Sequence, residues 1–318
     1  MNSIAYIETE DGMIKAPSKE AAIYASKISD NPAAIILGSS MSEDAVKGLG
    51  KLGMKNVYWI KDESLNVNNI QAYASAIINC IEQHNAEQVV FANSSLGTIV
   101  AARCAAKLDA SIATNVVSLP ENSNGYKVKR SIYTGKAFAF MDMVKSKKIL
   151  CIKKNAVEVV EGNGIANITT LDFNIPAEDT NSKVTGAEKA SGDILLTEAE
   201  IVVSGGRGLK GPEHWGMVEE LAGILGAATG CSKPVSDMEW RPHHEHVGQT
   251  GIKVSPQLYI AIGISGAIQH LAGVNSSKYI LVINKDPEAP FFKAADYGVV
   301  GDAFEVVPKL IEELKALN

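Results

Sequence analysis

Cysteine is scarce in this sequence. Only four cysteines occur among 318 residues, and Cys80, Cys104, Cys151 and Cys231 lie far apart without a C-x-x-C pair. This spacing argues against a disulfide framework and against the common zinc and dithiol motifs, and it is typical of reduced thiols in a cytosol-like compartment. A chain of this length can bury roughly 75% of its unfolded surface, so it needs no disulfide or metal ion to stabilise its fold.

Long apolar runs and an excess of basic residues are also missing. No stretch approaches the roughly 18 uninterrupted apolar residues of a membrane-spanning helix, and the start, MNSIAYIETEDGM, lacks the cationic and apolar parts of a signal peptide. The formal net charge of −6 argues against a nucleic-acid partner, because phosphate backbones bind to basic surfaces. We therefore expect a soluble protein that is not exported and binds no nucleic acid.

What is present is a repeated alternation of apolar runs and helical stretches. The length favours two domains of about 150 residues. In the first half we predict strands at 4–7, 33–37, 57–60 and 89–92, each followed by a helix, at 21–28, 44–49, 70–81 and 96–108. Further strand-like runs follow at 128–133, 137–141, 149–152 and 157–160, partly antiparallel. This alternation is typical of a doubly wound parallel sheet with helices on both faces.

A polar stretch separates the two halves of the chain. Residues 172–193 lose the apolar period, and we predict the linker there. A second α/β series starts with a strand at 201–203 and ends with an amphipathic helix at 308–317. The predicted fold is two doubly wound three-layer (α/β/α) domains with mainly parallel sheets, an N-terminal domain of residues 1–190 and a C-terminal domain of residues 191–318.

The stretch from Leu258 to Pro290 predicts a βαβ unit that holds a nucleotide. Strands are expected at 258–262 and 279–283, with a short helix between them. Gly263 and Gly266 allow a sharp turn, Ser265 is placed to cap the helix, and Gly273 is placed to end it. Unpaired N–H groups at such a turn attract phosphate.

Polar residues follow the strands of the second half where a doubly wound sheet binds its ligands. They are Ser204-Gly-Gly-Arg207, Gly263 to Gly266, Asn284-Lys-Asp286 and Asp302. The glycines permit close approach of a ligand, arginine suits phosphate, and amide or carboxylate groups suit ribose hydroxyls. We therefore expect one ligand-binding edge in the C-terminal domain.

Three other candidate sites are less favoured. Gly206-Arg-Gly-Leu-Lys-Gly211 fits the G-x-G-x-x-G pattern of dinucleotide-binding folds, but its bulky residues and the late position of Asp237 argue against an NAD site. His243-His-Glu-His246 could supply metal ligands, yet adjacent side chains diverge, so we favour a solvated loop. A catalytic serine is not indicated, because no G-x-S-x-G elbow occurs.

Long motifs in the second half resemble the electron-transfer flavoprotein alpha-subunit family. The core ISGAIQHLAG and the loop INKDPEAP carry the likeness, together with Ser204-Gly-Gly-Arg-Gly-Leu209, Val247-Gly-Gln-Thr-Gly251, Ala295-Asp-Tyr-Gly298 and Asp302. The resemblance is strong over about the last 120 residues, and these motifs are long and specific. Over the first half it is architectural only.

The resemblance implies that the C-terminal domain binds FAD. Ser265 would contact the pyrophosphate, Asn284 and Asp302 would contact hydroxyl or amide edges, Thr250 would donate to flavin N5, and His270 would place a cation near the pyrimidine carbonyl. One position departs from the family: many members have arginine where this chain has Lys233, which keeps the charge but loses planar stacking. The implied FAD contacts are Arg207, Ser232, Lys233, Val247, Gly248, Gln249, Thr250, Ser265, Gly266, Ala267, Ile268, Gln269, His270, Asn284, Asp302 and Ala303.

The resemblance also implies an electron carrier with no substrate turnover of its own. Its FAD would accept electrons from flavoprotein dehydrogenases, such as the acyl-CoA dehydrogenases of fatty-acid beta-oxidation, and pass them to a membrane quinone oxidoreductase. The N-terminal domain would bind no nucleotide and would help to form a heterodimer with a beta subunit. The location would be cytoplasmic in a bacterium, or the mitochondrial matrix if a transit peptide has been removed. The alternative is a flavin- or NAD-dependent oxidoreductase with its own small-molecule substrate.

Overall fold

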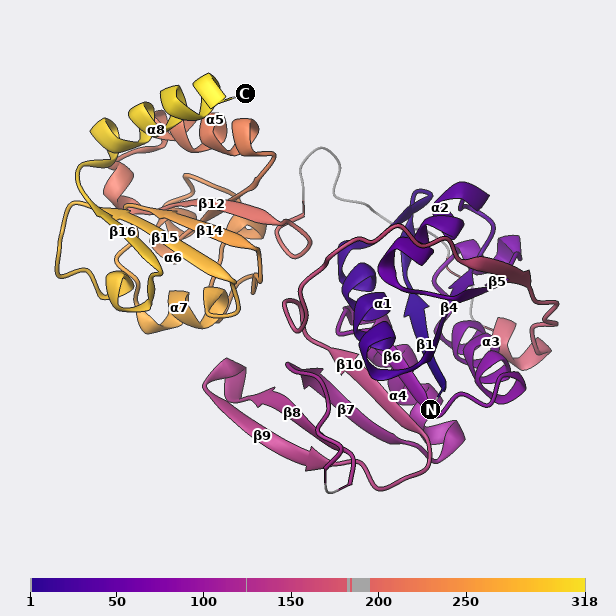
Figure 1. Cartoon of the computed structure of the whole chain (residues 1–318). Helices are drawn as coiled ribbons and strands as arrows, with labels where there is room; N and C mark the ends of the chain where they lie inside the picture. Colours follow the sequence, from indigo (N-terminus) through magenta and orange to yellow (C-terminus); the bar gives the residue numbers. More distant parts are fainter. Residues whose placement is uncertain (1, 124, 182–183, 185–194, 318) are drawn as a thin grey trace. The chain divides into compact units, whose positions relative to one another are not determined.

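The computed structural model divides the chain into two compact units, Met1–Glu188 and Lys189–Asn318 (Figure 1). It describes residues 2–123, 125–181, 184 and 195–317. Each unit is built on a mainly parallel sheet with helices on both faces, which confirms the predicted fold class. None of the helices in these ranges is both long and apolar enough to cross a membrane.

The first unit contains a nine-stranded sheet in the order β11-β5-β4-β1-β6-β10-β7-β8-β9. Strand pairs from β11 to β7 are parallel, whereas β8 pairs antiparallel with both β7 and β9, so the predicted antiparallel addition is confirmed. The strands are β1 (Asn2–Ile7), β4 (Asn31–Leu37), β5 (Asn56–Ile60), β6 (Gln88–Ala92), β7 (Ser111–Val116), β8 (Lys127–Ile132), β9 (Ala137–Asp142), β10 (Lys148–Ile152) and β11 (Asn167–Thr170). A small antiparallel pair, β2 (Thr9–Glu10) and β3 (Met13–Ile14), lies outside this sheet.

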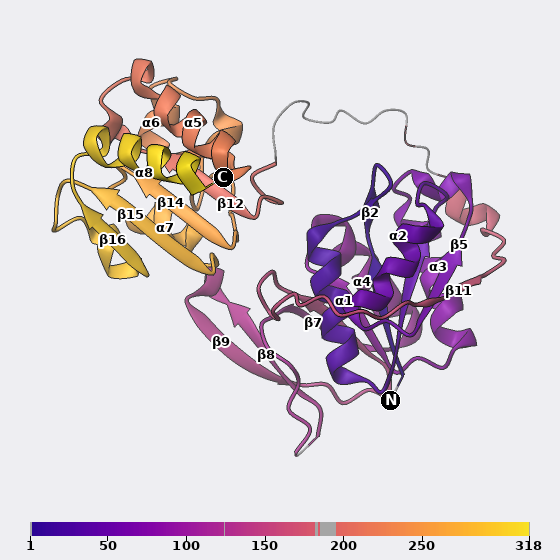
Figure 2. The same cartoon turned by 45° about the horizontal axis from the view of Figure 1, so that its top comes forward.

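The alternation of side chains along the central strand explains the two helical layers. Ile4 and Tyr6 of β1 belong to the core beneath α3 (Ile70–Gln83) and α4 (Ser95–Leu108). Ala5 and Ile7 belong to the opposite core, beneath α1 (Ala16–Ile28) and α2 (Glu43–Lys47). Because successive residues of a strand point to opposite faces, an apolar run such as Ile4–Ile7 stabilises both layers at once. Figure 2 shows the two layers from a second direction.

Two predictions for the end of this unit were wrong. Residues 157–160 form no strand; the next strand is β11, which pairs with β5. The predicted linker does not begin at 172, because Phe173 and Ile175 pack on the core and Asp179 is buried in a short 3-10 turn, Ala177–Thr180. Asn69 Nδ2 donates to the backbone oxygen of Asp179 (2.8 Å) and anchors this segment. Most of the remaining predicted linker, 182–183 and 185–193, lies outside the described residues.

The second unit contains a five-stranded parallel sheet in the order β13-β12-β14-β15-β16. Its helices α5 (Gly216–Leu225), α6 (Lys233–Asp237) and α8 (Ala303–Leu317) pack on one face, and α7 (Ile268–Val274) packs on the other. The predicted last helix therefore starts five residues earlier, at Ala303, and includes Pro308. The strands are β12 (Ile201–Gly205), β13 (Ala228–Cys231), β14 (Leu258–Ile262), β15 (Tyr279–Asn284) and β16 (Tyr297–Val300).

Candidate functional site

The carboxyl edge of the second sheet contains the topological switch point. Strand β12 pairs with β13 on one side and with β14 on the other, so the connections after β12 and β14 leave in different directions. Ligands of doubly wound sheets bind in the crevice at such a point. Arg207 follows β12, Ser232 follows β13, Ser265 follows β14, Asn284 ends β15 and Asp302 follows β16. The structure thus brings these predicted site residues to one edge.

Glycines allow the two central connections to lie against each other. Gly206 N donates to Ile262 O (2.8 Å), and Gly208 N donates to Gly263 O (3.0 Å). A Cβ on Gly208 would lie 2.8 Å from Gly263 Cα, so a larger residue would separate the loops. Two 3-10 turns, Arg207–Leu209 and Pro212–His214, precede α5, so no α-helix starts within the G-x-G-x-x-G segment. The strand–turn–helix context of a dinucleotide fingerprint is missing there.

The connection after β14 differs in detail from the prediction. Helix α7 starts at Ile268 with Ala267 at its N-cap, so Ser265 does not cap it, and Gly273 lies inside the helix. Gly273 is needed for packing instead, because a Cβ there would lie 2.5 Å from Gly248 Cα. Gly266 has φ +81° and lies against Phe291, a conformation and a contact that favour glycine.

The loop Val247–Thr250 is attached to both the sheet and α7. Val247 N donates to Cys231 O (2.9 Å), and Gln249 N donates to Gln269 O (2.7 Å). These hydrogen bonds place Gln249 and Thr250 beside the segment that contains Gln269. Residues that are about twenty positions apart in the sequence therefore share one exposed surface.

Many of the predicted contacts offer unused polar groups at this edge. The exposed members are Arg207, Lys233, Gln249, Thr250, Ser265, Ala267, Ile268 and Gln269. Within the described ranges, none of their polar side chains makes a hydrogen bond or an ion pair. Hydrogen-bonding groups gathered at a switch point without internal partners are what a polar ligand requires.

Other predicted contacts are used within the fold. Asn284 Nδ2 donates to Ile264 O (3.0 Å), which ties β15 to the connection after β14. Asp302 Oδ1 accepts a hydrogen bond from Phe304 N (3.0 Å) at the start of α8. The buried members are Ser232, Val247, Gly248, Gly266, His270 and Ala303.

His270 is the residue predicted to supply a cation beside the flavin. Its ring is buried, and Nε2 lies 2.9 Å from the Tyr259 hydroxyl. Burial and, to a lesser extent, the nearby His246 together lower the pKa of His270 to about 4, while the Val247 backbone acts in the opposite direction. This low pKa favours a neutral imidazole at pH 7, so a cation at His270 beside the flavin stays a prediction.

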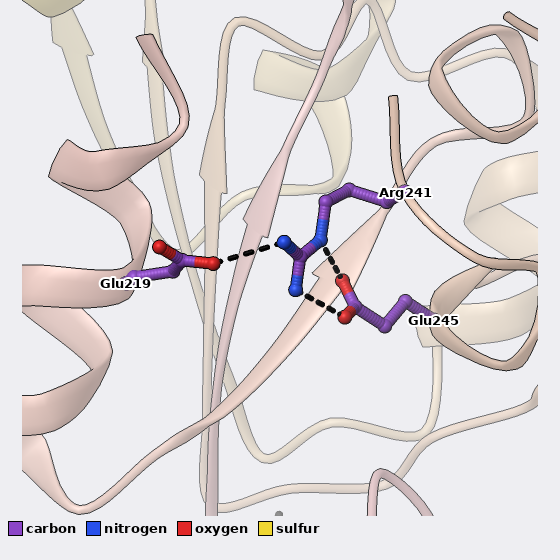
Figure 3. A network of polar contacts seen from close by, with 3 residues as sticks. All are labelled: Glu219, Arg241 and Glu245. Carbon is purple, nitrogen blue, oxygen red and sulfur yellow. Dashed lines mark hydrogen bonds and ion pairs between the residues drawn. The ribbon is translucent and has the colours of Figure 1, made fainter. Parts of the chain in front are cut away.

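The prediction of a solvated loop at His243–His246 is wrong. It forms a 3-10 turn in which Glu245 and His246 are buried. Arg241 binds Glu245 through Nε–Oε2 (2.8 Å) and Nη2–Oε1 (2.5 Å), and it also binds Glu219 of α5 (2.9 Å; Figure 3). Within the described ranges, no three His, Cys, Asp or Glu side chains are arranged to hold a metal ion. The turn thus supports the Val247–Thr250 loop that follows it.

Sequence reasoning missed the supporting residues Arg241, Glu245 and Tyr259. The i, i+4 spacing of Arg241 and Glu245 was a usable signal for an ion pair. Tyr259 gave little signal, because one aromatic residue within an apolar run is expected of any buried strand.

Comparison with known proteins agrees with this architecture. Residues 3–176 match the electron transfer flavoprotein domain family, and residues 195–275 match the electron transfer flavoprotein FAD-binding domain family. The electron transfer flavoprotein subunit alpha of Syntrophomonas wolfei is 38% identical over 311 residues, 98% of each chain. That of Bacillus subtilis is 35% identical and covers 98% of this chain and 96% of its own. A probable mitochondrial subunit alpha of Caenorhabditis elegans is 35% identical, over 99% of this chain and 94% of its own.

FAD is the cofactor indicated by the matched C-terminal family. The chemistry of the edge fits this group, because Arg207 and Lys233 are exposed cations suited to anionic groups. The exposed Gln249, Thr250, Ser265 and Gln269 can donate to ribityl or ring oxygens. The glycines of the two central connections have no side chains, so a ligand can approach the backbone closely there. By both family models and by its identity with relatives along nearly the whole chain, this protein belongs to the electron-transfer flavoprotein alpha-subunit family.

Proposed function

We propose that this chain is the alpha subunit of a heterodimeric electron-transfer flavoprotein. FAD bound to the C-terminal domain, residues 191–318, supplies the redox chemistry by accepting and releasing electrons. The donors are flavoprotein dehydrogenases such as acyl-CoA dehydrogenases, and the acceptor is a membrane quinone oxidoreductase. The chain itself turns over no substrate. Membership of the family supports this proposal, and the predicted compartment, cytoplasmic in a bacterium, accords with the bacterial relatives.

The observation that carries the proposal is the set of unpaired polar side chains at the switch point. We assign FAD to this edge, with Arg207 and Ser265 toward the pyrophosphate and Thr250 toward the flavin ring. Exposed donors on several different connections can hold both ends of a long dinucleotide at once. The buried members of the predicted set would act by shaping the backbone or by supporting the exposed ones.

The N-terminal domain, residues 1–190, is proposed to bind no nucleotide. Its own switch point lies between β1 and β6, where a ligand would meet the start of α4. Glu8 follows β1, is 5% exposed, and accepts a hydrogen bond from Ser94 Oγ (2.5 Å) at the N-cap of α4. Its Oε1 also lies 2.7 Å from the position of a Cβ on Gly97. A carboxylate of the protein itself therefore occupies the place where a phosphate would be favoured.

We assign the contact with the beta subunit to the outer strand of the first sheet. β9 ends the sheet, and its Phe138 and Phe140 are 55% and 58% exposed on one face. Lys129 lies over the Phe138 ring at 4.4 Å. Exposed aromatic residues ringed by polar groups are typical of protein interfaces. The word "subunit" in the relatives' names makes a beta subunit the expected occupant.

Coexpression with the candidate beta subunit tests the proposal. The purified complex should show a flavin absorption spectrum and release FAD on denaturation. A purified acyl-CoA dehydrogenase with its acyl-CoA should bleach this spectrum, whereas acyl-CoA alone should not. Bleaching by a small substrate without any dehydrogenase would support the alternative, an oxidoreductase with its own substrate.

A further inference from the structure

A buried pair of polar side chains lies directly beneath the proposed FAD edge. Tyr259, the second residue of β14, is 0% exposed, and its hydroxyl lies 2.9 Å from Nε2 of His270, which is 7% exposed. Phe291 packs edge-on against the His270 ring, with ring centroids 5.6 Å apart. Both side chains are buried and pack against Phe291, so a lost hydrogen bond is costly there because water cannot replace it.

The backbone of His270 adjoins exposed residues that the proposed ligand would meet. It lies in the first turn of α7, next to the exposed Gln269, whose carbonyl holds Gln249 N at 2.7 Å. On its other side, a Cβ at Gly248 would lie 3.8 Å from His270 Cα. A displacement of the His270 backbone would consequently reach Gln269 and the Gly248–Gln249 segment.

We propose that Tyr259 is a positioning residue for FAD, which acts by fixing the orientation and tautomer of His270. The proposal rests on the function proposed above. The hydroxyl connects a rigid strand of the sheet to the short helix α7, whose seven residues give it little stability of its own. A neutral imidazole accepts a hydrogen bond through one ring nitrogen and donates through the other. The partner of Nε2 therefore determines whether Nδ1 is the donor or the acceptor. Burial keeps the His270 pKa low, which agrees with this neutral state.

Tyr259→Phe removes only the hydroxyl and keeps the ring. In the chain labelled with ¹⁵N-histidine, the nitrogen shifts of His270 should change from one tautomer to a mixture. In the heterodimer, FAD should bind about threefold to tenfold more weakly, as expected for the loss of one buried hydrogen bond, and its midpoint potential should shift. Tyr279→Phe, which removes a hydroxyl from an exposed tyrosine on β15, is the matched control and should change neither.

A double-mutant cycle separates positioning from simple packing. If Tyr259 acts through His270, Tyr259→Phe should have no further effect on FAD affinity or potential in a His270→Leu background. An equal effect in both backgrounds would overturn the proposal, as would a single, unchanged His270 tautomer in Tyr259→Phe. Failure of the proposed function would look different: the wild-type heterodimer would not bind FAD, while the ¹⁵N spectra would still report the Tyr259–His270 pair.

Discussion

The backbone of Gly206 lies against the carbonyl group of Gly263, and the two connections at the switch point touch there. Gly206 N donates to Ile262 O (2.8 Å), and a Cβ on Gly206 would overlap the Gly263 carbonyl oxygen. The loops that present Arg207 and Ser265 are therefore positioned by backbone contact, with no room for a side chain between them. The exposed polar side chains of the site therefore project from a closely packed backbone base.

Gly206→Ala should separate the two connections and destabilise the C-terminal unit. Overpacking of this kind costs about 1–3 kcal/mol, and here the obstacle is backbone that cannot rotate away. Urea denaturation followed by tryptophan fluorescence measures the loss. Gly223→Ala is the matched control: Gly223 is exposed in α5 with no atom near a built Cβ, so the change should stabilise by about 0.5–1 kcal/mol. Equal stability of Gly206→Ala and wild type would contradict the contact.

Arg241→Met should destabilise the same unit by on the order of 2 kcal/mol. The substitution leaves the Glu245 carboxylate buried without its partner. An unpaired buried charge destabilises a fold by more than the intact ion pair stabilises it. A second change, Glu245→Met, should restore much of the loss, because it removes the unpaired charge. Lys315→Met breaks the exposed pair with Glu220 and should change the free energy of unfolding by about 0.5 kcal/mol or less. No recovery in the double variant would argue against this account.

The sequence predicts the sheets and the gathering of the site better than it predicts local helix ends. Apolar runs such as Ile4–Ile7 specify buried parallel strands, and polar residues directly after strands must share the carboxyl edge. β7 was missed because its sequence, SIATNV, mixes polar and apolar residues on a partly covered strand. Ser265 was misplaced as a cap because tertiary contacts of Gly266 with Phe291 carry the chain further before the helix starts.

The charge state of His270 shows a second limit of sequence reasoning. An imidazole next to a proposed flavin is readily interpreted as a cation. Its protonation depends on burial, on His246 and on the backbone of Val247, and the last two lie twenty-four and twenty-three positions away in the sequence. Only the folded arrangement reveals that the neutral form is favoured.

The burial of His270 should make stability depend on pH. Its pKa is about 4 in the fold and about 6.5 when unfolded, so the unfolded chain binds more protons between these values. The free energy of unfolding should therefore fall as the pH decreases from about 6.5 to about 4, by about 3 kcal/mol, and this contribution should level off below pH 4. His270→Gln should have a smaller slope in urea denaturation across this window, whereas His244→Gln, at an exposed position, should retain the wild-type slope. Identical slopes for His270→Gln and wild type would exclude His270 as the cause.

Phe138→Lys combined with Phe140→Lys should weaken association with the beta subunit. Aromatic residues at the centre of an interface contribute about 2 kcal/mol each when they are hot spots, so about 30-fold weaker binding per residue is expected. Both rings are exposed in the isolated chain, so its thermal unfolding should change little. Analytical ultracentrifugation of the coexpressed subunits measures the dissociation constant. The control Met13→Lys alters an exposed apolar residue elsewhere on the same unit and should leave the dissociation constant unchanged. If Met13→Lys weakens binding as much as the double phenylalanine variant does, β9 is not the interface.

Lys233→Gln should lower the midpoint potential of bound FAD, and Lys233→Arg should raise it slightly or leave it unchanged. Lys233 is exposed at the start of α6, directly after the buried Ser232, and its ammonium group makes no ion pair within the described ranges. A cation beside the flavin stabilises the negative charge that reduction adds, but water screens this exposed cation. The stabilisation should therefore be about 1 kcal/mol or less, which shifts the midpoint potential of a two-electron couple by about 20 mV or less. Arginine keeps the charge and adds planar stacking. Spectroelectrochemical titration measures the potentials, with Lys309→Gln, on the exposed side of α8, as the charge-matched control. If Lys309→Gln and Lys233→Gln shift the potential equally, the effect is one of net charge, and Lys233 does not belong to the flavin site.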